Sequence, residues 1–79
     1  MLLIVDDEKP TREGLRAALE DRYDVYLAED PASAMDLLER EHSAVLLTDF
    51  RLPNEDGMKL IARAKSLPRP PVCILMTAY

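Results

Sequence analysis

The chain is poor in the residues that build disulfides, glycine-rich loops and aromatic binding surfaces. Its 79 residues include one cysteine, one histidine, two glycines and no tryptophan. A single cysteine excludes an internal disulfide, and Cys73, inside an apolar run, is expected to be a small buried hydrophobic residue. Gly14 and Gly57 are too far apart to form a loop that cradles a nucleotide phosphate. Disulfide-stapled and nucleotide-binding domains are therefore not expected.

Basic charge is also scarce. The chain has 10 lysine and arginine residues against 15 acidic ones, a formal net charge of −5, and the basic residues are scattered. This distribution does not favour direct binding of nucleic acid. The apolar stretch 1–5 is too short for a membrane span and lacks the flanks of a signal peptide. We expect a cytoplasmic protein with no membrane partner.

Short apolar runs alternate with longer segments of helical period, a pattern typical of βαβ units and a parallel sheet. We predict strands over residues 1–5, 24–28, 44–48 and 72–76. The first, third and fourth are almost wholly apolar, which predicts burial on both faces. The second is mixed in polarity and suits a sheet edge.

Three helices are predicted between these strands. Pro10 suits the first turn of one helix, and Asp30 followed by Pro31 predicts a capped start for the next, which should end near His42. His42 is expected to cap that helix rather than to carry phosphate. The third helix should follow Gly57 and end before the proline cluster at 68–71. The residues expected on the inner faces are Leu15, Ala18, Leu19, Ala34, Leu37, Leu38, Leu60, Ile61, Ala64 and Leu67.

Polar residues follow three of the predicted strands. Asp6 and Asp7 follow the first, Asp49 the third and Thr77 the fourth. Right-handed crossovers place the carboxyl ends of parallel strands along one edge, so these side chains should converge. One acidic residue at a strand end is usually a cap or a solvated group, but closely packed carboxylates repel each other unless a cation joins them. Oxygen donors without His or Cys favour Mg²⁺.

Several segments together resemble the receiver domain of bacterial two-component response regulators. They are Ile4-Val5-Asp6-Asp7-Glu8, Leu47-Thr48-Asp49-Phe50-Arg51-Leu52-Pro53, Asp56-Gly57 and Met76-Thr77-Ala78. The resemblance implies a CheY-like, flavodoxin-like α/β fold, an open parallel sheet with strand order 2-1-3-4. A full receiver has five strands and five helices, so residues 1–79 are interpreted as an incomplete receiver domain lacking the fifth strand and the last two helices. The segments around Asp49 and Thr77 look most like receivers of the nitrogen-regulator type, which implies transcription regulation.

The resemblance also implies roles for individual residues. Asp49 would accept a phosphoryl group from a sensor histidine kinase or from a small donor such as acetyl phosphate. Asp6, Asp7, Asp49 and the backbone carbonyl of Arg51 would bind Mg²⁺, and the Thr77 hydroxyl would contact the phosphoryl group and start the switch. A receiver of this kind is not a conventional enzyme, since it promotes its own phosphorylation and dephosphorylation.

Two further residues match the receiver pattern, and one expected residue is missing. Pro53 and Gly57 stand four and eight residues after Asp49, as in the family, and Gly57 is expected to adopt a backbone conformation that other residues disfavour. The family's active-site lysine has no counterpart, because Lys9, Lys59 and Lys65 fall in the first and third predicted helices.

Two alternatives differ from a working phosphoacceptor. The first is a truncated or pseudo-receiver that serves only as an association module, which the missing lysine favours. In either case a homodimer or oligomer is expected through the exposed edge of strand 72–76. The second is a phosphatase of the haloacid-dehalogenase class, which needs a second acid two residues after its nucleophile. Arg51 occupies that position and argues against it.

Overall fold

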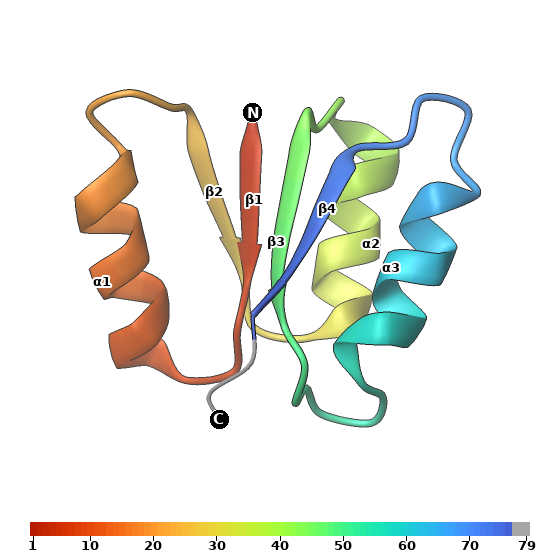
Figure 1. Ribbon diagram of the computed structural model, residues 1–79, viewed down its shortest axis with the longest axis horizontal. Helices are drawn as coiled ribbons and strands as arrows, with labels where there is room; N and C mark the ends of the chain where they lie inside the picture. Colours follow the sequence, from red (N-terminus) through yellow and green to blue (C-terminus); the bar gives the residue numbers. More distant parts are fainter. Residues whose placement is uncertain (77–79) are drawn as a thin grey trace.

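Four parallel strands form one open sheet in the computed structural model, which describes residues 1–76 (Figure 1). The strand order is β2-β1-β3-β4. The elements are β1 (Leu2–Val5), α1 (Lys9–Leu19), β2 (Val25–Ala28), α2 (Pro31–Arg40), β3 (Val45–Asp49), α3 (Gly57–Lys65) and β4 (Val72–Met76). This order confirms the predicted flavodoxin-like α/β arrangement and the position of the second strand at an edge. The described part of the chain contains no fifth strand.

Local sequence signals start the helices where they were predicted. The Asp30 side chain accepts a hydrogen bond from the Ser33 backbone N–H at 2.7 Å and caps α2. α3 is capped in the same way, because Asp56 accepts from the Lys59 N–H at 3.0 Å. Each carboxylate satisfies an N–H that has no partner inside the helix.

The end of α2 differs from the prediction. The helix stops at Arg40, and the capping N–H is that of Glu41, which donates to the Leu37 carbonyl at 2.8 Å. His42 lies beyond this cap, so its expected capping role is wrong.

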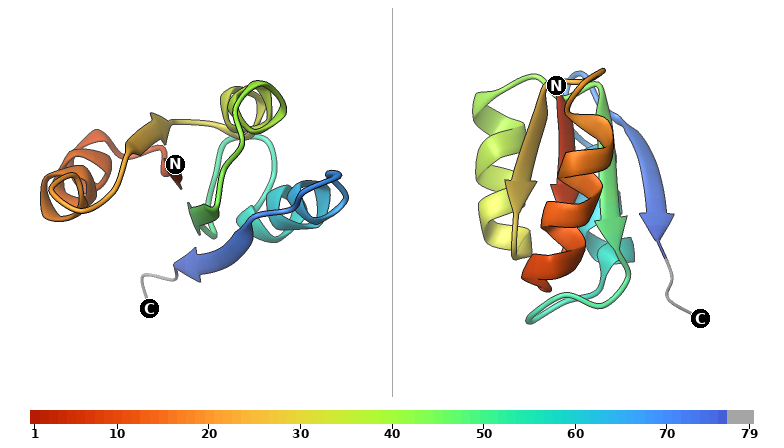
Figure 2. Two further views of the ribbon diagram at one scale, coloured as in Figure 1. Left: turned by 90° about the horizontal axis from the view of Figure 1, so that it is seen from above. Right: turned by 90° about the vertical axis from the view of Figure 1, so that its left-hand side faces the viewer.

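One face of the sheet is covered by α2 and α3, and this side holds the core (Figure 2). Leu3 and Leu46 are paired on adjacent strands and belong to one buried cluster with Leu60 and Ala64 of α3, and all four are fully buried. The other buried residues of this cluster are Val5, Ala28, Ala34, Leu38 and Ile61. The apolar period of α2 and α3 therefore predicted this face correctly.

Within residues 1–76 the opposite face is covered by one helix, α1, which packs against β1 and β2 (Figures 1 and 2). α1 has no fully buried residue: Leu15 and Leu19 are half-buried, and Ala18, predicted to face inward, is exposed. On β4, Val72 is 65% exposed and Ile74 48% exposed.

Burial on both faces therefore holds for β1 but not for β3 or β4. β3 alternates between buried and half-buried residues, and β4 has no fully buried residue. Cys73, expected to be buried, is half-buried against the core, and this desolvation raises the pKa of its thiol. The apolar composition of a strand does not specify which helix will cover it.

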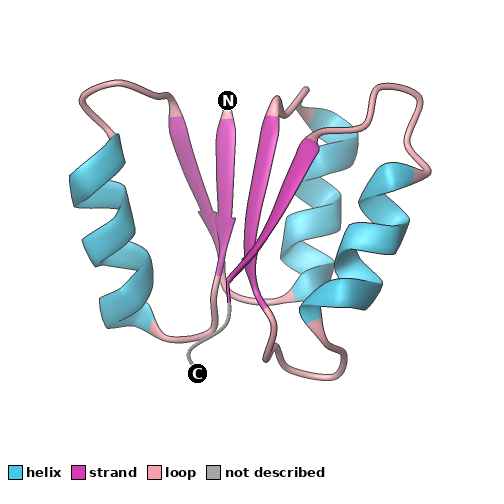
Figure 3. Cartoon of the chain, viewed as in Figure 1, coloured by secondary structure: helices cyan, strands magenta, loops and turns pink. Residues whose placement is uncertain are grey.

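All strands run in one direction, so their carboxyl ends gather at one edge of the sheet (Figure 3). The connections to α1, α2 and α3 leave from that edge. None of the helices described within residues 1–76 is long and apolar enough to cross a membrane.

Candidate functional site

Three carboxylates meet at the carboxyl edge of the sheet. One oxygen atom from each of Asp6, Asp7 and Asp49 lies within 4.8 Å of the other two. The register explains this proximity, because Val5 of β1 is paired with Thr48 of β3, and the acidic residues follow directly. The structure thus brings together the three acidic residues that the predicted strand order places at one edge.

Asp6 is the buried member of the cluster, with 3% of its surface exposed. Its N–H donates to the Ala28 carbonyl at 3.1 Å, and its Oδ1 accepts from the Glu8 N–H at 2.9 Å. Burial raises the pKa of the Asp6 carboxyl, the Glu8 hydrogen bond opposes this shift, and the charges of Asp49 and Asp7 raise the pKa further. A cation bound between these groups would relieve the unfavourable charge.

Asp49 is half-buried and ends β3. The next residue, Phe50, donates its N–H to the Met76 carbonyl at 3.0 Å and accepts from the Gly57 N–H at 2.7 Å. Asp49 is therefore held between β4 and the start of α3.

Gly57 is required by this close approach. A Cβ at position 57 would lie 2.2 Å from the carbonyl oxygen of Asp49 and 3.1 Å from Leu75 Cδ1. No glycine of the described chain has a positive φ. The prediction that Gly57 supplies an unusual backbone conformation is thus wrong, and the reason for a glycine here is the space between α3 and Asp49.

The turn after β3 has its left-handed residue at Asn54, with φ of 72°. Asparagine tolerates this conformation better than most residues, and its position beside Pro53 was a local signal that the sequence interpretation missed. Arg51 pairs with Asp56 in an isolated antiparallel bridge. The expected role of the Arg51 carbonyl as a metal ligand stays a prediction, and Thr77 lies outside the described residues.

Arg12 also contacts this site and was not predicted to do so. Its Nη1 donates to the Asp6 carbonyl oxygen at 2.8 Å, although α1 begins three residues earlier. Helical side chains lean toward the helix N-terminus, so a long side chain in this turn can reach back to the preceding strand end. The helix dipole disfavours a cation near a helix N-terminus. An arginine in this turn was therefore a sequence signal that its side chain makes a compensating interaction.

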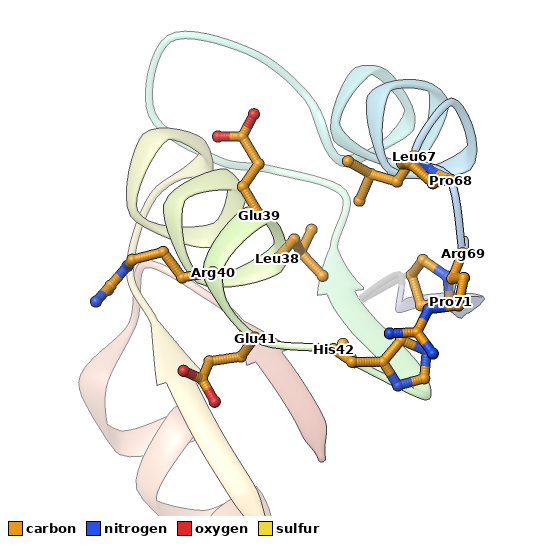
Figure 4. Close-up of a pocket in the computed structure, with 10 residues that line it drawn as sticks. Leu38, Glu39, Arg40, Glu41, His42, Leu67, Pro68, Arg69 and Pro71 are labelled. Carbon is orange, nitrogen blue, oxygen red and sulfur yellow. The ribbon is translucent and has the colours of Figure 1, made fainter.

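A separate hollow of about 450 Å³ lies at the opposite end of the sheet (Figure 4). It is lined by the end of α2 and the loop after α3, including Arg40, His42 and Arg69. None of the three clustered carboxylates lines it. The hollow and the acidic cluster are therefore distinct features.

Comparison with known proteins agrees with this geometry. The sequence profile of the family described as response regulator receiver domain matches residues 2–79. The chain belongs to this receiver family. A curated relative of the receiver, an uncharacterized 14.6 kDa protein of Leptolyngbya boryana, is 40% identical over 81 residues. That match covers 99% of this chain and 62% of the relative, so the receiver chain spans less than two thirds of that protein.

Solved receivers have the same arrangement of strands and helices. The response regulator TrrA of Thermotoga maritima, in complex with Mg²⁺-BeF, is 28% identical with a TM-score of 0.90, over 99% of this chain and 69% of its own. The MaeR response regulator bound to beryllium trifluoride is 28% identical with a TM-score of 0.88, over 99% of this chain and 66% of its own. A receiver of Methylobacillus flagellatus reaches a TM-score of 0.92 at 18% identity, covering 99% of this chain and 69% of its own, which shows the shared fold alone.

Proposed function

We propose that this receiver accepts a phosphoryl group on Asp49 from a sensor histidine kinase, assisted by Mg²⁺ bound to Asp6, Asp7 and Asp49. The observation that carries the proposal is the approach of the three carboxylates to within 4.8 Å at the ends of two adjacent strands. The donor set consists of oxygens only, which suits a hard divalent cation. The response regulator TrrA, which is 28% identical to this chain, was solved in complex with Mg²⁺-BeF, and this supports a Mg²⁺ site in this receiver.

The chemistry assigned to Asp49 is nucleophilic substitution at phosphorus by a carboxylate. A carboxylate oxygen forms the new O–P bond while the bond from phosphorus to the donor's leaving atom breaks, and that electron pair stays on the leaving group. Mg²⁺, when bound, offsets negative charge on the phosphoryl oxygens. The Arg51 carbonyl is proposed as a further oxygen ligand, and the Thr77 hydroxyl as a hydrogen-bond donor to the attached group.

The same proposal covers the domain to which these residues belong. We propose that residues 1–79 correspond to the first four strands of a cytoplasmic receiver domain, as the match over 69% of the TrrA chain supports. Assignment to the nitrogen-regulator type, with a role in transcription regulation, stays a prediction from the segments around Asp49.

An association module is the second candidate, favoured by the exposed apolar surface of β4. Val72 and Ile74 lie on the side of the sheet that α1 leaves open, and β4 is an edge strand of the described sheet. Exposed apolar edge strands favour pairing with another chain. In this form the chain would be a homodimer through β4 with a metal site but without efficient phosphorylation.

Incubation with Mg²⁺ and acetyl phosphate, followed by intact-protein mass spectrometry, tests the phosphoacceptor. The expected result is a phosphoryl adduct that is absent from Asp49→Asn and present in Asp56→Asn. Asp56 is a matched control, because it lies in the same connection and caps α3. An unmodified wild-type chain, under conditions that label a complete receiver, would contradict the proposal and favour the association module.

Sedimentation velocity tests the second candidate. The association module predicts that the wild type dimerises and that Ile74→Lys stays monomeric, because the charge would be placed on the exposed apolar surface of β4. Met58→Lys is the control, since Met58 is similarly exposed but lies on α3. A monodisperse wild-type monomer excludes dimerisation through β4.

A further inference from the structure

Arg12 connects the first helix to the backbone of the acidic cluster. Its side chain is 12% exposed, although it is charged and belongs to a helix without a fully buried residue. Nη1 donates to the Asp6 carbonyl at 2.8 Å, and Nη2 lies 3.9 Å from Oε2 of Glu29. A long cation is thus withdrawn from solvent to reach one backbone carbonyl.

The orientation of the Asp6 carbonyl affects the orientation of Asp7. The Asp6 carbonyl and the Asp7 N–H belong to one planar peptide unit, so a hydrogen bond that fixes the carbonyl also fixes the plane from which Asp7 departs. Asp6 is already held by its N–H to Ala28 and by its carboxylate to the Glu8 amide. Asp7, in contrast, is exposed, and within residues 1–76 its carboxylate accepts no hydrogen bond. The direction of Asp7 therefore depends on its backbone.

We propose that Arg12 is a positioning residue: its guanidinium holds the peptide plane between Asp6 and Asp7 and so keeps the Asp7 carboxylate directed toward Asp6 and Asp49. The inference rests on the proposed metal site. Arg12 touches neither the metal nor the phosphoryl group in this scheme, and it acts only through the backbone. Outer residues that orient metal ligands typically change affinity by about 10-fold or more.

The alternative role for Arg12 is purely electrostatic, and it predicts the opposite change in Mg²⁺ affinity when Arg12 is replaced. A fixed positive charge near the site repels Mg²⁺, so its removal would strengthen Mg²⁺ binding. Loss of the hydrogen bond to the Asp6 carbonyl would instead weaken binding. The ion pair with Glu29 is long and its acidic partner is 69% exposed, so it contributes little by itself.

Calorimetric titration with MgCl₂ at constant ionic strength separates these roles. Arg12→Met keeps much of the side-chain length without charge or donor, and we expect it to bind Mg²⁺ about 10-fold more weakly than the wild type. Arg12→Lys keeps the positive charge and a hydrogen-bond donor, but the donor has a different geometry. Its Mg²⁺ affinity is expected to lie between those of the wild type and Arg12→Met. Glu29→Gln, which leaves the bond to Asp6 in place, is the matched control and should retain wild-type affinity. Equal or tighter binding by Arg12→Met overturns the proposal.

Amide hydrogen exchange without metal gives a second readout. The Glu8 amide, bonded to the Asp6 carboxylate, should exchange about fivefold faster in Arg12→Met, while the Leu46 amide in the core strand keeps its protection. Faster exchange at both amides would indicate general destabilisation and contradict a positioning role. If Arg12→Met does not fold, Arg12→Lys decides, and wild-type affinity together with wild-type Glu8 exchange in that variant overturns the proposal. A wild type that binds no Mg²⁺ refutes the proposed metal site, and the Glu8 exchange still tests whether Arg12 holds the turn.

Discussion

The two faces of the sheet contain similar residues but differ in burial. On the face under α2 and α3, Leu3, Leu46 and Leu60 are fully buried. On the other face α1 covers only β1 and β2, and Val72 and Ile74 of β4 remain largely exposed. Adjacent side chains of one strand point to opposite faces, so an apolar strand supplies both kinds of surface. The number of helices on each side decides which surface becomes core.

The same contrast recurs at the acidic edge. Asp6 is buried and held by backbone hydrogen bonds, whereas its neighbour Asp7 is exposed. Two adjacent carboxylates thus differ in solvation although they belong to one cluster. The following substitutions test how far these contrasts control stability.

The largest loss of folding stability is expected on the sheet face that α2 and α3 cover. Leu60→Ala removes a fully buried side chain and should lower the free energy of unfolding by about 2–5 kcal/mol. Met58→Ala, at an exposed position of the same helix, should change it by less than about 0.5 kcal/mol. Urea denaturation followed by circular dichroism measures both. Equal losses would show that the two faces of α3 do not differ as the structure describes.

A smaller loss of folding stability is expected from a substitution at the start of α3, where the helix approaches Asp49 of the acidic cluster. Gly57→Ala places a Cβ against the Asp49 carbonyl and should cost about 1–3 kcal/mol through overpacking. Gly14→Ala is the control, because a Cβ at position 14 meets nothing within 4 Å and alanine favours a helix by about 1 kcal/mol. Opposite signs for the two substitutions are therefore expected in the same denaturation experiment. A stabilised Gly57→Ala variant would refute the close approach.

Substitution of Asp6 tests the cost of a buried carboxylate. Its pKa is raised in the folded chain by burial, so the folded state favours the protonated form. Below the unfolded pKa, about 3.9, the carboxyl is protonated in both states and Asp6→Asn should match the wild type. As the pH rises through the folded pKa, the wild type becomes less stable relative to Asp6→Asn.

Denaturation of both chains from acid to neutral pH in EDTA measures this difference, and Mg²⁺ should reduce it by stabilising the wild type. A stability difference that does not change with pH would show that Asp6 is not desolvated in the folded chain.

The smallest effect is expected on the open face. Val72→Thr keeps the branched shape at a position that is 65% exposed, and it should change stability by less than about 0.5 kcal/mol. The same substitution type at a buried position, Val5→Thr, should cost more because it buries a hydroxyl. Thermal melts at one protein concentration compare the two. A large loss at Val72 would mean that β4 is covered in solution, as the proposed homodimer requires.

Residues close together in the chain predicted the elements, their order and the acidic edge. Asp30 and Asp56 cap helices through amides only three residues away, so their roles could be inferred from consecutive residues. The parallel crossovers then placed Asp6, Asp7 and Asp49 at one edge, as the structure shows.

Tertiary structure decided the features that depend on distant atoms. The need for glycine at position 57 arises from the Asp49 carbonyl, and the reach of Arg12 to the Asp6 carbonyl depends on where α1 lies beside β1. The exposure of Val72 likewise depends on a helix that covers only part of one face. The sequence by itself determined the local hydrogen bonds and the strand ends, because these involve neighbours in the chain. Burial and close approach were decided only when separate elements packed together.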